Sequence, residues 1–304
     1  MAAKKTSLQR RIESGKPLLL AEMSPPGGTD PAPLRQAARH CAGKVHALGV
    51  SDNRDRVRMS ALAAAALVAA EGVEPILHLV TRDRNRIALI ADVLGAQALG
   101  VRNLLCTSGT HQTLGRYRTA RNVFDIDSIQ LLAACRELAA DGSLVGEEAI
   151  DGAGPFCLGA VAAPFADPPE MQLLRLVKKT AAGAQFLITQ PVFDLERFGA
   201  WWKEVTRRGI HEKVAIVAGI QPLVDATAAQ ELAGKRPLPR IPEATLTRLA
   251  SQDGAARQRA AGIQIAMETI EQLSALAGLR GFAVCGDGDL DAALEVVERI
   301  RIRD

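Results

Sequence analysis

The strongest constraint on the fold is an alternation of short apolar segments with longer helical ones along the whole chain. The apolar segments lack the polar–apolar alternation of a half-exposed strand, which predicts strands of a parallel sheet covered on both faces. The predicted strands are residues 17–24, 44–50, 74–81, 103–106, 156–162, 185–189, 214–218 and 281–285. Helical patterns lie at about residues 57–70, 127–140, 169–182, 194–207, 225–233, 254–277 and 290–302, with one more beginning near residue 31 and another ending near residue 99.

Eight successive strand–helix units in 304 residues predict an α/β fold, a (β/α)8 TIM barrel. We expect one domain over residues 1–304, with residues 1–16 as a polar N-terminal extension. An open doubly wound sheet is the alternative. A dinucleotide-binding sheet of that kind needs a Gly-x-Gly-x-x-Gly motif after its first strand, and none occurs there. The closed barrel is therefore the better prediction.

Charge and cysteine content narrow the class of protein. The chain has 37 Lys and Arg against 34 Asp and Glu, a small surplus without the concentrated basic face of a nucleic-acid-binding protein. The longest purely apolar run, residues 61–70, is about half of the ~20 residues that a membrane span needs. The first 16 residues lack the apolar stretch of a signal peptide. The five scattered cysteines favour neither a disulfide framework nor a metal site, so we expect a cytoplasmic protein without membrane, nucleic-acid or metal partners.

Polar residues gather where the predicted strands end, and in a barrel of this kind the chemistry lies at the carboxyl ends of the strands. Glu22 is the sharpest of them, because it lies inside an apolar strand and shortly before two prolines. Desolvation there would raise a carboxyl pKa, as a general acid near neutral pH requires; a structural carboxylate that accepts backbone hydrogen bonds is the alternative. His78 can contact a ligand or be a satisfied core residue. The other strand-end candidates include Ser51, Asp52, Asn53, Thr81, residues 107–110, residues 164–167, Gln190, residues 219–221 and Asp287.

Two further features have a structural and a functional interpretation. The charged cluster at residues 82–86 predicts a solvated helix start with internal ion pairs, and phosphate contact is its alternative. Trp201 and Trp202 lie within a predicted helix, where they predict packing or a subunit contact.

Several segments together resemble the methylenetetrahydrofolate reductase family, the flavin-dependent barrel enzymes of one-carbon metabolism that serve methionine biosynthesis. The most specific is LRLVKKTAAGAQFLITQPVFD at residues 174–194. The others, in order and at suitable spacing, are AEMSPP at 21–26, HLVT at 78–81, LLCTSGT at 104–110, VAGIQPL at 217–223 and GIQIAMETI at 262–270. The likeness runs over about residues 22–282, while AVCGD at 283–287 departs from the aromatic eighth strand of the best-known members.

The resemblance implies a reaction and a set of site residues. Reduced flavin gives hydride to the methylene carbon of 5,10-methylenetetrahydrofolate and yields 5-methyltetrahydrofolate, with NAD(P)H as the electron donor. Glu22 matches the family's general acid, which protonates the leaving N10 nitrogen, and Gln190 matches the glutamine that contacts the pterin. The family's flavin-contact positions carry Ser51, His78, Ser108, Gly109, Gln172, Arg175 and Lys179. The last three lie at i, i+3 and i+7 of one helix and so share a face. On the implied alignment, Arg175 and Lys179 would pair with the diphosphate of FAD.

Some positions differ from the family pattern. Thr110 stands where the family usually has an aspartate near flavin and folate, and Gln172 replaces an acidic residue. Residues 163–167 lack the Tyr and His that commonly contact the adenosine side of FAD. FMN, or a barrel without flavin, therefore stays open as an alternative to FAD.

Two other functional interpretations remain beside the reductase. One is a tetrahydrofolate-binding barrel that acts in methyl transfer, which the strand-end residues Asp52 and Asn53 leave open. The other is a non-catalytic subunit of a redox complex. The expected partners are a tetrahydrofolate derivative and NAD(P)H, with a homo-oligomer or a redox-partner assembly as further possibilities.

Overall fold

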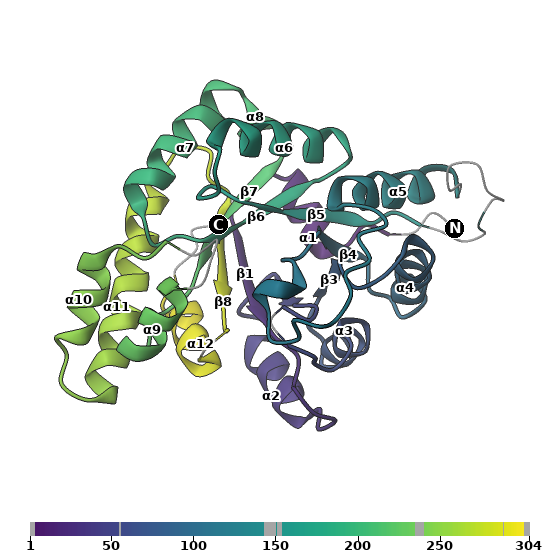
Figure 1. Ribbon diagram of the computed structural model, residues 1–304. Coiled ribbons are helices and arrows are strands. Elements are labelled where there is room, and N and C mark those ends of the chain that lie inside the picture. The colour runs from purple at the N-terminus through teal and green to yellow at the C-terminus, as the bar shows by residue number, and fades with distance from the viewer. Residues whose placement is uncertain are drawn as a thin grey trace.

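The strands of the chain close into a single parallel barrel (Figure 1). The computed structural model describes residues 4–54, 56–142, 150, 154–234, 240–287 and 289–300. Each strand pairs in parallel with the next along the chain, and the last pairs with the first, so the predicted (β/α)8 TIM barrel is confirmed. The strands are β1 Leu18–Met23, β2 Ala47–Val50, β3 Pro75–Val80, β4 Asn103–Thr107, β5 Cys157–Ala162, β6 Phe186–Pro191, β7 Ala215–Ile220 and β8 Gly281–Cys285.

Helices surround the barrel and cover the outer face of the sheet (Figure 1). They are α1 Ser7–Glu13, α2 Ala32–Cys41, α3 Ala61–Ala70, α4 Arg86–Ala98, α5 Ser128–Asp141, α6 Pro169–Ala181, α7 Leu195–Arg207, α8 Ile210–Lys213, α9 Ala226–Gly234, α10 Glu243–Ala250, α11 Ala255–Ser274 and α12 Leu290–Arg299, with a 3₁₀ turn η1 at Gln112–Leu114. The end of the predicted last helix, residues 301–302, lies outside the described residues. No helix in the described ranges combines the length and apolar character that a membrane span requires.

One helix begins later than its sequence pattern indicates. The pattern starts near residue 57, whereas α3 starts at Ala61. The preceding backbone N–H groups bond elsewhere: Arg58 donates to the Asn53 side chain at 3.1 Å, and Met59 donates to the Pro26 carbonyl at 2.9 Å. The second bond ties the β2–α3 loop to the β1–α2 loop, and both loops belong to the carboxyl end of the barrel.

Small residues inside the barrel make room for large ones. Phe186 on β6 is fully buried, and a Cβ at Gly159 on β5 would lie 2.2 Å from its ring. The interior core therefore needs glycine at this point, since a side chain and the ring cannot occupy the same space. The interior cluster consists of Leu8, Leu18, Leu20, Ala47, Ile76, Leu105, Cys157, Phe186, Ile188, Ala215, Val217 and Ala283.

The expected polar extension contains a helix that packs on the barrel. Residues of α1 lie against the amino ends of the strands, and Leu8 is fully buried in the interior cluster. The Glu74 carboxylate accepts hydrogen bonds from the backbone N–H groups of Ser7 (2.9 Å) and Leu8 (3.0 Å). Helix α1 therefore closes the end of the barrel opposite the predicted site, which the polar composition of residues 1–16 does not suggest.

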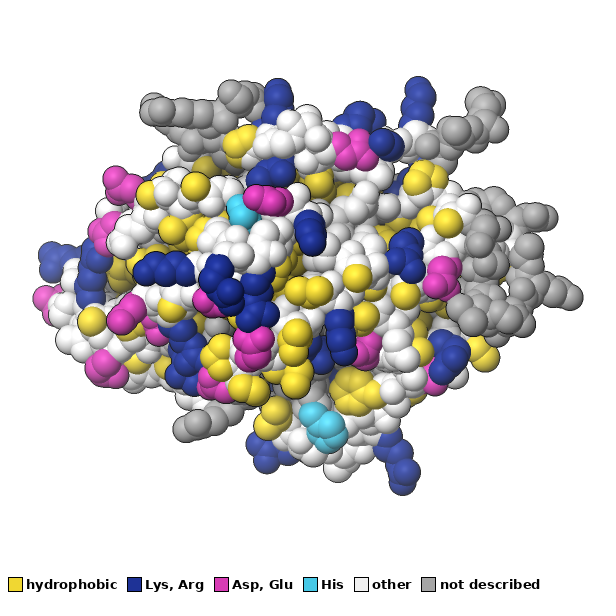
Figure 2. Space-filling model, turned by 90° about the horizontal axis from the view of Figure 1, so that it is seen from above, with side chains coloured by type: hydrophobic (Ala, Val, Ile, Leu, Met, Phe, Trp, Pro, Cys, Tyr) yellow, Lys and Arg dark blue, Asp and Glu magenta, His cyan; other side chains and the backbone are white. Residues whose placement is uncertain are grey.

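The two tryptophans belong to the packing of the outer layer. Trp201 and Trp202 are 5% and 4% exposed, and on α7 the Phe198 ring is tilted against Trp201 and stacked with Trp202. The packing interpretation is thus the correct one, because so little of either ring is available to a second subunit. The five cysteines are all buried as free thiols. On the face seen in Figure 2, Lys and Arg side chains are interspersed with acidic and hydrophobic ones.

Candidate active site at the carboxyl end of the barrel

A cavity of ≈ 350 Å³ opens at the carboxyl ends of the strands. This volume lies within the usual range of small-molecule sites. Apolar side chains of β4, β5 and β6 form part of its wall, and polar groups stand above them. All ten residues predicted for the site line this cavity: Glu22, Ser51, His78, Ser108, Gly109, Thr110, Gln172, Arg175, Lys179 and Gln190.

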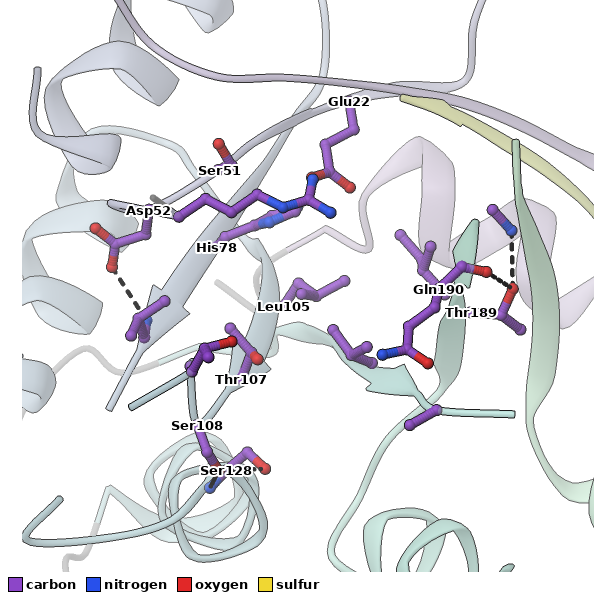
Figure 3. Close-up of a pocket in the computed structure, with 18 of the residues that line it drawn as sticks. Glu22, Ser51, Asp52, His78, Leu105, Thr107, Ser108, Ser128, Thr189 and Gln190 are labelled. Carbon is purple, nitrogen blue, oxygen red and sulfur yellow. Dashed lines mark hydrogen bonds and ion pairs between the residues drawn. The ribbon is translucent and has the colours of Figure 1, made fainter. Parts of the chain in front are cut away.

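Glu22 and Gln190 come from separate strands and face the same space (Figure 3). The Glu22 side chain is 16% exposed. The Oε1 atom of Gln190 is buried, and no hydrogen-bond partner is recorded for it among the described residues. A buried amide oxygen without a partner is costly, so this atom is poised to accept a hydrogen bond from a ligand.

An irregularity between β6 and β7 places Gln190. The strand register shifts between Ile188 and Pro191. The Thr189 hydroxyl bridges the gap, since it donates to the Gln190 carbonyl at 2.8 Å and accepts from the Gly219 N–H at 2.9 Å. A Cβ at Gly219 would lie 2.5 Å from the Thr189 carbonyl, so the glycine allows the two strands to approach there.

His78 on β3 lies beside Glu22 within the barrel mouth. Its side chain is buried, and Nε2 has no hydrogen-bond partner among the described residues. A Cβ at Gly49 would lie 2.9 Å from Nε2 and 3.5 Å from Cγ of Glu22, so the glycine on β2 makes room for both. Burial lowers the pKa of His78, which leaves the imidazole neutral at pH 7.

A guanidinium that the sequence analysis missed also lies at the cavity. Nη1 of Arg54 donates to Oδ2 of Asp287 at 2.6 Å, to Oε1 of Glu22 at 3.3 Å and to Sγ of Cys285 at 3.5 Å. The second Asp287 oxygen accepts from the Ser24 hydroxyl at 2.6 Å, and Ser24 pairs with Ser51 at 2.8 Å. Oxygen and sulfur atoms of Glu22, Cys285 and Asp287 lie within 4.8 Å of one another, a spacing suited to a cation, and the Arg54 guanidinium contacts all three.

The inner face of α6 brings cations to the opposite wall. Lys179 is 8% exposed and donates from Nζ to the Val161 carbonyl at 2.5 Å. Burial, with Arg175 nearby, lowers the pKa of Lys179 to about 8. Arg175 and Gln172 line the cavity from the same helix. Four basic side chains (Arg54, Arg82, Arg175 and Lys179) and two acidic ones (Glu22 and Asp52) line the cavity, a balance that favours an anionic ligand.

The β4–α5 loop is fixed by its own packing. Gly109 has φ of +79°, and a Cβ there would lie 2.7 Å from Val80, so glycine is required whatever the loop binds. The Arg82 guanidinium donates to the carbonyls of Thr110 (3.0 Å) and Asn53 (2.8 Å) and pairs with Asp83. Ser108 accepts from the backbone N–H of Ser128, at the start of α5, at 3.2 Å.

The interpretation of the charged cluster changes here. Arg82 is 5% exposed, so the cluster at residues 82–86 has the predicted internal ion pairs but is not simply a solvated helix start. The Asp52 carboxylate is also buried, accepts from the Val80 N–H at 3.0 Å and pairs with Arg84. Asp52 and Asn53, the residues that leave the methyl-transfer interpretation open, thus form internal bonds that hold the loops in place.

The fold and the cavity define a class: a (β/α)8 barrel with a polar, ligand-sized site at the carboxyl ends of its strands. Comparison with known proteins specifies the family. The model of the methylenetetrahydrofolate reductase family matches residues 7–300, and the chain therefore belongs to that family.

One curated relative and one solved structure illustrate the similarity. A probable methylenetetrahydrofolate reductase (NADPH) of Caenorhabditis elegans is 24% identical over 185 residues, which is 60% of this chain and 25% of that protein. The chain thus matches about a quarter of the length of this relative. A Clostridium thermocellum protein described as binding two copies of 5-methyl-5,6,7,8-tetrahydrofolic acid superimposes with a TM-score of 0.62 at 13% identity, over 96% of this chain and 98% of that one. At this identity the likeness shows the fold.

Proposed function

We propose that the protein is a flavin-dependent oxidoreductase that interconverts 5,10-methylenetetrahydrofolate and 5-methyltetrahydrofolate, with Glu22 as the general acid. One observation carries the proposal: the Glu22 carboxyl and the unpartnered Gln190 amide oxygen face one cavity. Membership of the methylenetetrahydrofolate reductase family supports it, as does the similar barrel described as binding 5-methyltetrahydrofolate.

The role of Glu22 follows from the chemistry of the substrate. Opening the five-membered ring of methylenetetrahydrofolate requires a proton on the leaving N10 nitrogen, and the methylene carbon then accepts hydride. A carboxylic acid in a largely buried site supplies that proton and is left as a carboxylate. Glu22 lines the cavity with a side chain that is 16% exposed, which suits this transfer.

Gln190 would orient the pterin. An amide offers both donors and an acceptor, which complement the adjacent N–H and carbonyl groups of the pterin edge. Its Oε1 has no partner among the described residues, so a donor on the ligand would satisfy it.

The charge and the lining of the cavity support a flavin as the cofactor. Arg175 and Lys179 would face the phosphates, Ser108 and Gln172 would contact the ring system or its side chain, and His78 offers an unpartnered Nε2. When bound, the flavin would supply the hydride. We propose FAD as the cofactor with FMN as the alternative, NAD(P)H as the electron donor and the cytoplasm as the location.

The test separates the two half-reactions. The Glu22→Gln variant, loaded with FAD or FMN, is compared with the unchanged protein in NAD(P)H–methylenetetrahydrofolate and NAD(P)H–menadione assays. We expect the folate reaction to fall by about 10²–10⁴-fold, the usual contribution of general acid catalysis, while menadione reduction survives. Glu243→Gln, an exposed carboxyl on α10, is the matched control and should leave both rates unchanged.

Two results would count against the proposal. Equal loss of both half-reactions in the Glu22 variant would assign the carboxyl a structural role. An unchanged protein that reduces no folate with either flavin would remove the proposed reaction itself and favour a folate-binding or non-catalytic barrel.

A further inference from the structure

Arg54 lies between two carboxylates and contacts them unequally. The distance from Nη1 to Asp287 is 2.6 Å, against 3.3 Å to Glu22. Within the described ranges, Arg54 is the one hydrogen-bonding partner recorded for the Glu22 carboxyl. The orientation of the proposed acid therefore depends on where this guanidinium is held.

Asp287 is anchored on several sides. Ser24 donates to its Oδ1 at 2.6 Å, and the Gln221 amide donates to its carbonyl at 2.7 Å. Burial would raise the pKa of Asp287, but Arg54 and the Ser24 hydroxyl outweigh it and lower the pKa below its usual value. Asp287 is thus a fixed negative charge at the end of β8, able to draw a cation toward itself.

Two titratable groups beside Glu22, His78 and Cys285, carry no charge at neutral pH. His78 on β3 has a lowered pKa because it is buried, and burial with the two carboxylates raises the pKa of the Cys285 thiol to about 12. Arg58 acts on Asp287 through space, while its own guanidinium donates to the Pro25 carbonyl at 3.0 Å. Arg54, at 3.3 Å, and Asp287, within 4.8 Å, are thus the charged groups beside Glu22, while Asp52 acts on the neighbouring His78 and pairs with Arg84.

We propose that Arg54 and Asp287 are positioning residues for Glu22, with Asp287 holding the guanidinium away so that the acid can carry a proton toward N10. A cation that moved fully onto Glu22 would favour the carboxylate, which has no proton to give. A site without Arg54 would leave the carboxyl without a partner to orient it. This inference rests on the proposed function of Glu22.

The pH dependence of the folate half-reaction tests the proposal. A step that needs a protonated acid slows above the apparent pKa of that acid, which gives the pH–rate profile a falling limb at high pH. In Asp287→Asn the guanidinium is released to Glu22, so this limb should move down by about one pH unit or more; in Arg54→Gln it should move up. In the double variant, the Asp287 change should shift the limb less than it does with Arg54 present, because only the direct repulsion between the two carboxylates, whose oxygens lie within 4.8 Å, then remains.

Ser24→Ala provides a milder variant that keeps both charges. It removes one anchor of Asp287 and should move the limb in the same direction as Asp287→Asn by a smaller amount. Menadione reduction by NAD(P)H, measured in every variant, serves as the reference, so that movement of the limb is assigned to the folate half-reaction.

The outcomes separate the positioning role of Arg54 and Asp287 from the proposed folate reaction. If the unchanged protein reduces methylenetetrahydrofolate and the limb stays in place in Ser24→Ala and in both single variants, the positioning role is overturned while the proposed function stands. Uniform losses at every pH, without movement of the limb, would also overturn it, since a merely structural defect has that signature. A protein with no folate activity at any pH would instead remove the proposed function.

Discussion

Glu22 and Gln190 show what sequence can predict at the scale of residues. Each ends or interrupts an apolar strand, so the rule that strand ends carry the chemistry placed both at one end of the barrel. That they share a cavity follows once the strands close. Their chemical roles came from the family resemblance and stay predictions.

Arg54 shows the limit of the same approach. It is one of several arginines between β2 and α3, and nothing in that run marks the one that reaches Glu22. Its partner Asp287 comes from the other end of the chain, where the sequence departs from the family pattern. Pairs so distant in sequence depend on loop conformations that local patterns do not specify.

Lys179 gives a prediction about stability and pH. Its pKa falls from 10.5 to about 8 on folding, chiefly because the amine is buried, so between these values the unfolded chain binds more protons than the folded one. The free-energy cost of burying the charged amine is complete below pH 8 and is removed as the pH rises toward 10.5. We therefore expect the free energy of unfolding to rise over this window, by up to about 3 kcal/mol.

The measurement is urea unfolding between pH 7 and 10.5, with Lys179→Met compared against Lys178→Met. Both variants lose one positive charge from α6, but Lys178 is exposed. The rise in the free energy of unfolding that is expected for the unchanged protein should disappear in Lys179→Met and persist in Lys178→Met. Parallel curves for the two variants would show that the buried amine is not its source.

At the scale of elements, the strands were predicted better than the helices between them. Buried parallel strands are short apolar runs, and the predicted runs overlap β1 to β8 throughout. Helix α10 was not predicted, because prolines at 237, 239 and 242 precede it and the pattern reads as a loop. Helix α1 was also not predicted, since its buried residues are few and lie among charged ones.

The closure of the barrel by α1 leads to a prediction at this scale. Leu8→Ala removes a fully buried side chain from the interior cluster and should lower the free energy of unfolding by about 2–5 kcal/mol. Leu114→Ala is the matched control, since Leu114 is 58% exposed, and should change stability by less than about 0.5 kcal/mol. Equal stabilities in urea would mean that α1 does not contribute to the core.

At the scale of the whole molecule, the closed barrel explains why residues from the entire chain meet in one site. Glu22 from β1, His78 from β3, Gln190 from β6 and Asp287 after β8 are brought together only when β8 pairs with β1. The repeating pattern predicted this topology, because eight successive strand–helix units have few other arrangements. Folding and the assembly of the site are therefore one event, and a ligand of the site should stabilise the whole fold.

This coupling gives the last prediction. A ligand that binds only the folded chain raises the free energy of unfolding by about 2.7 kcal/mol at a hundred times its Kd. We expect 5-methyltetrahydrofolate to do so in urea unfolding, and p-aminobenzoylglutamate, which lacks the pterin, to do so far less. Gln190→Leu removes the pterin's proposed partner, at a cost of about 1–3 kcal/mol in binding, so about 1 kcal/mol or more of the stabilisation should be lost at the same ligand concentration. The unliganded stabilities of the two proteins serve as the baseline. Equal stabilisation of both proteins would show that the pterin does not reach the amide and would place the folate elsewhere on the barrel.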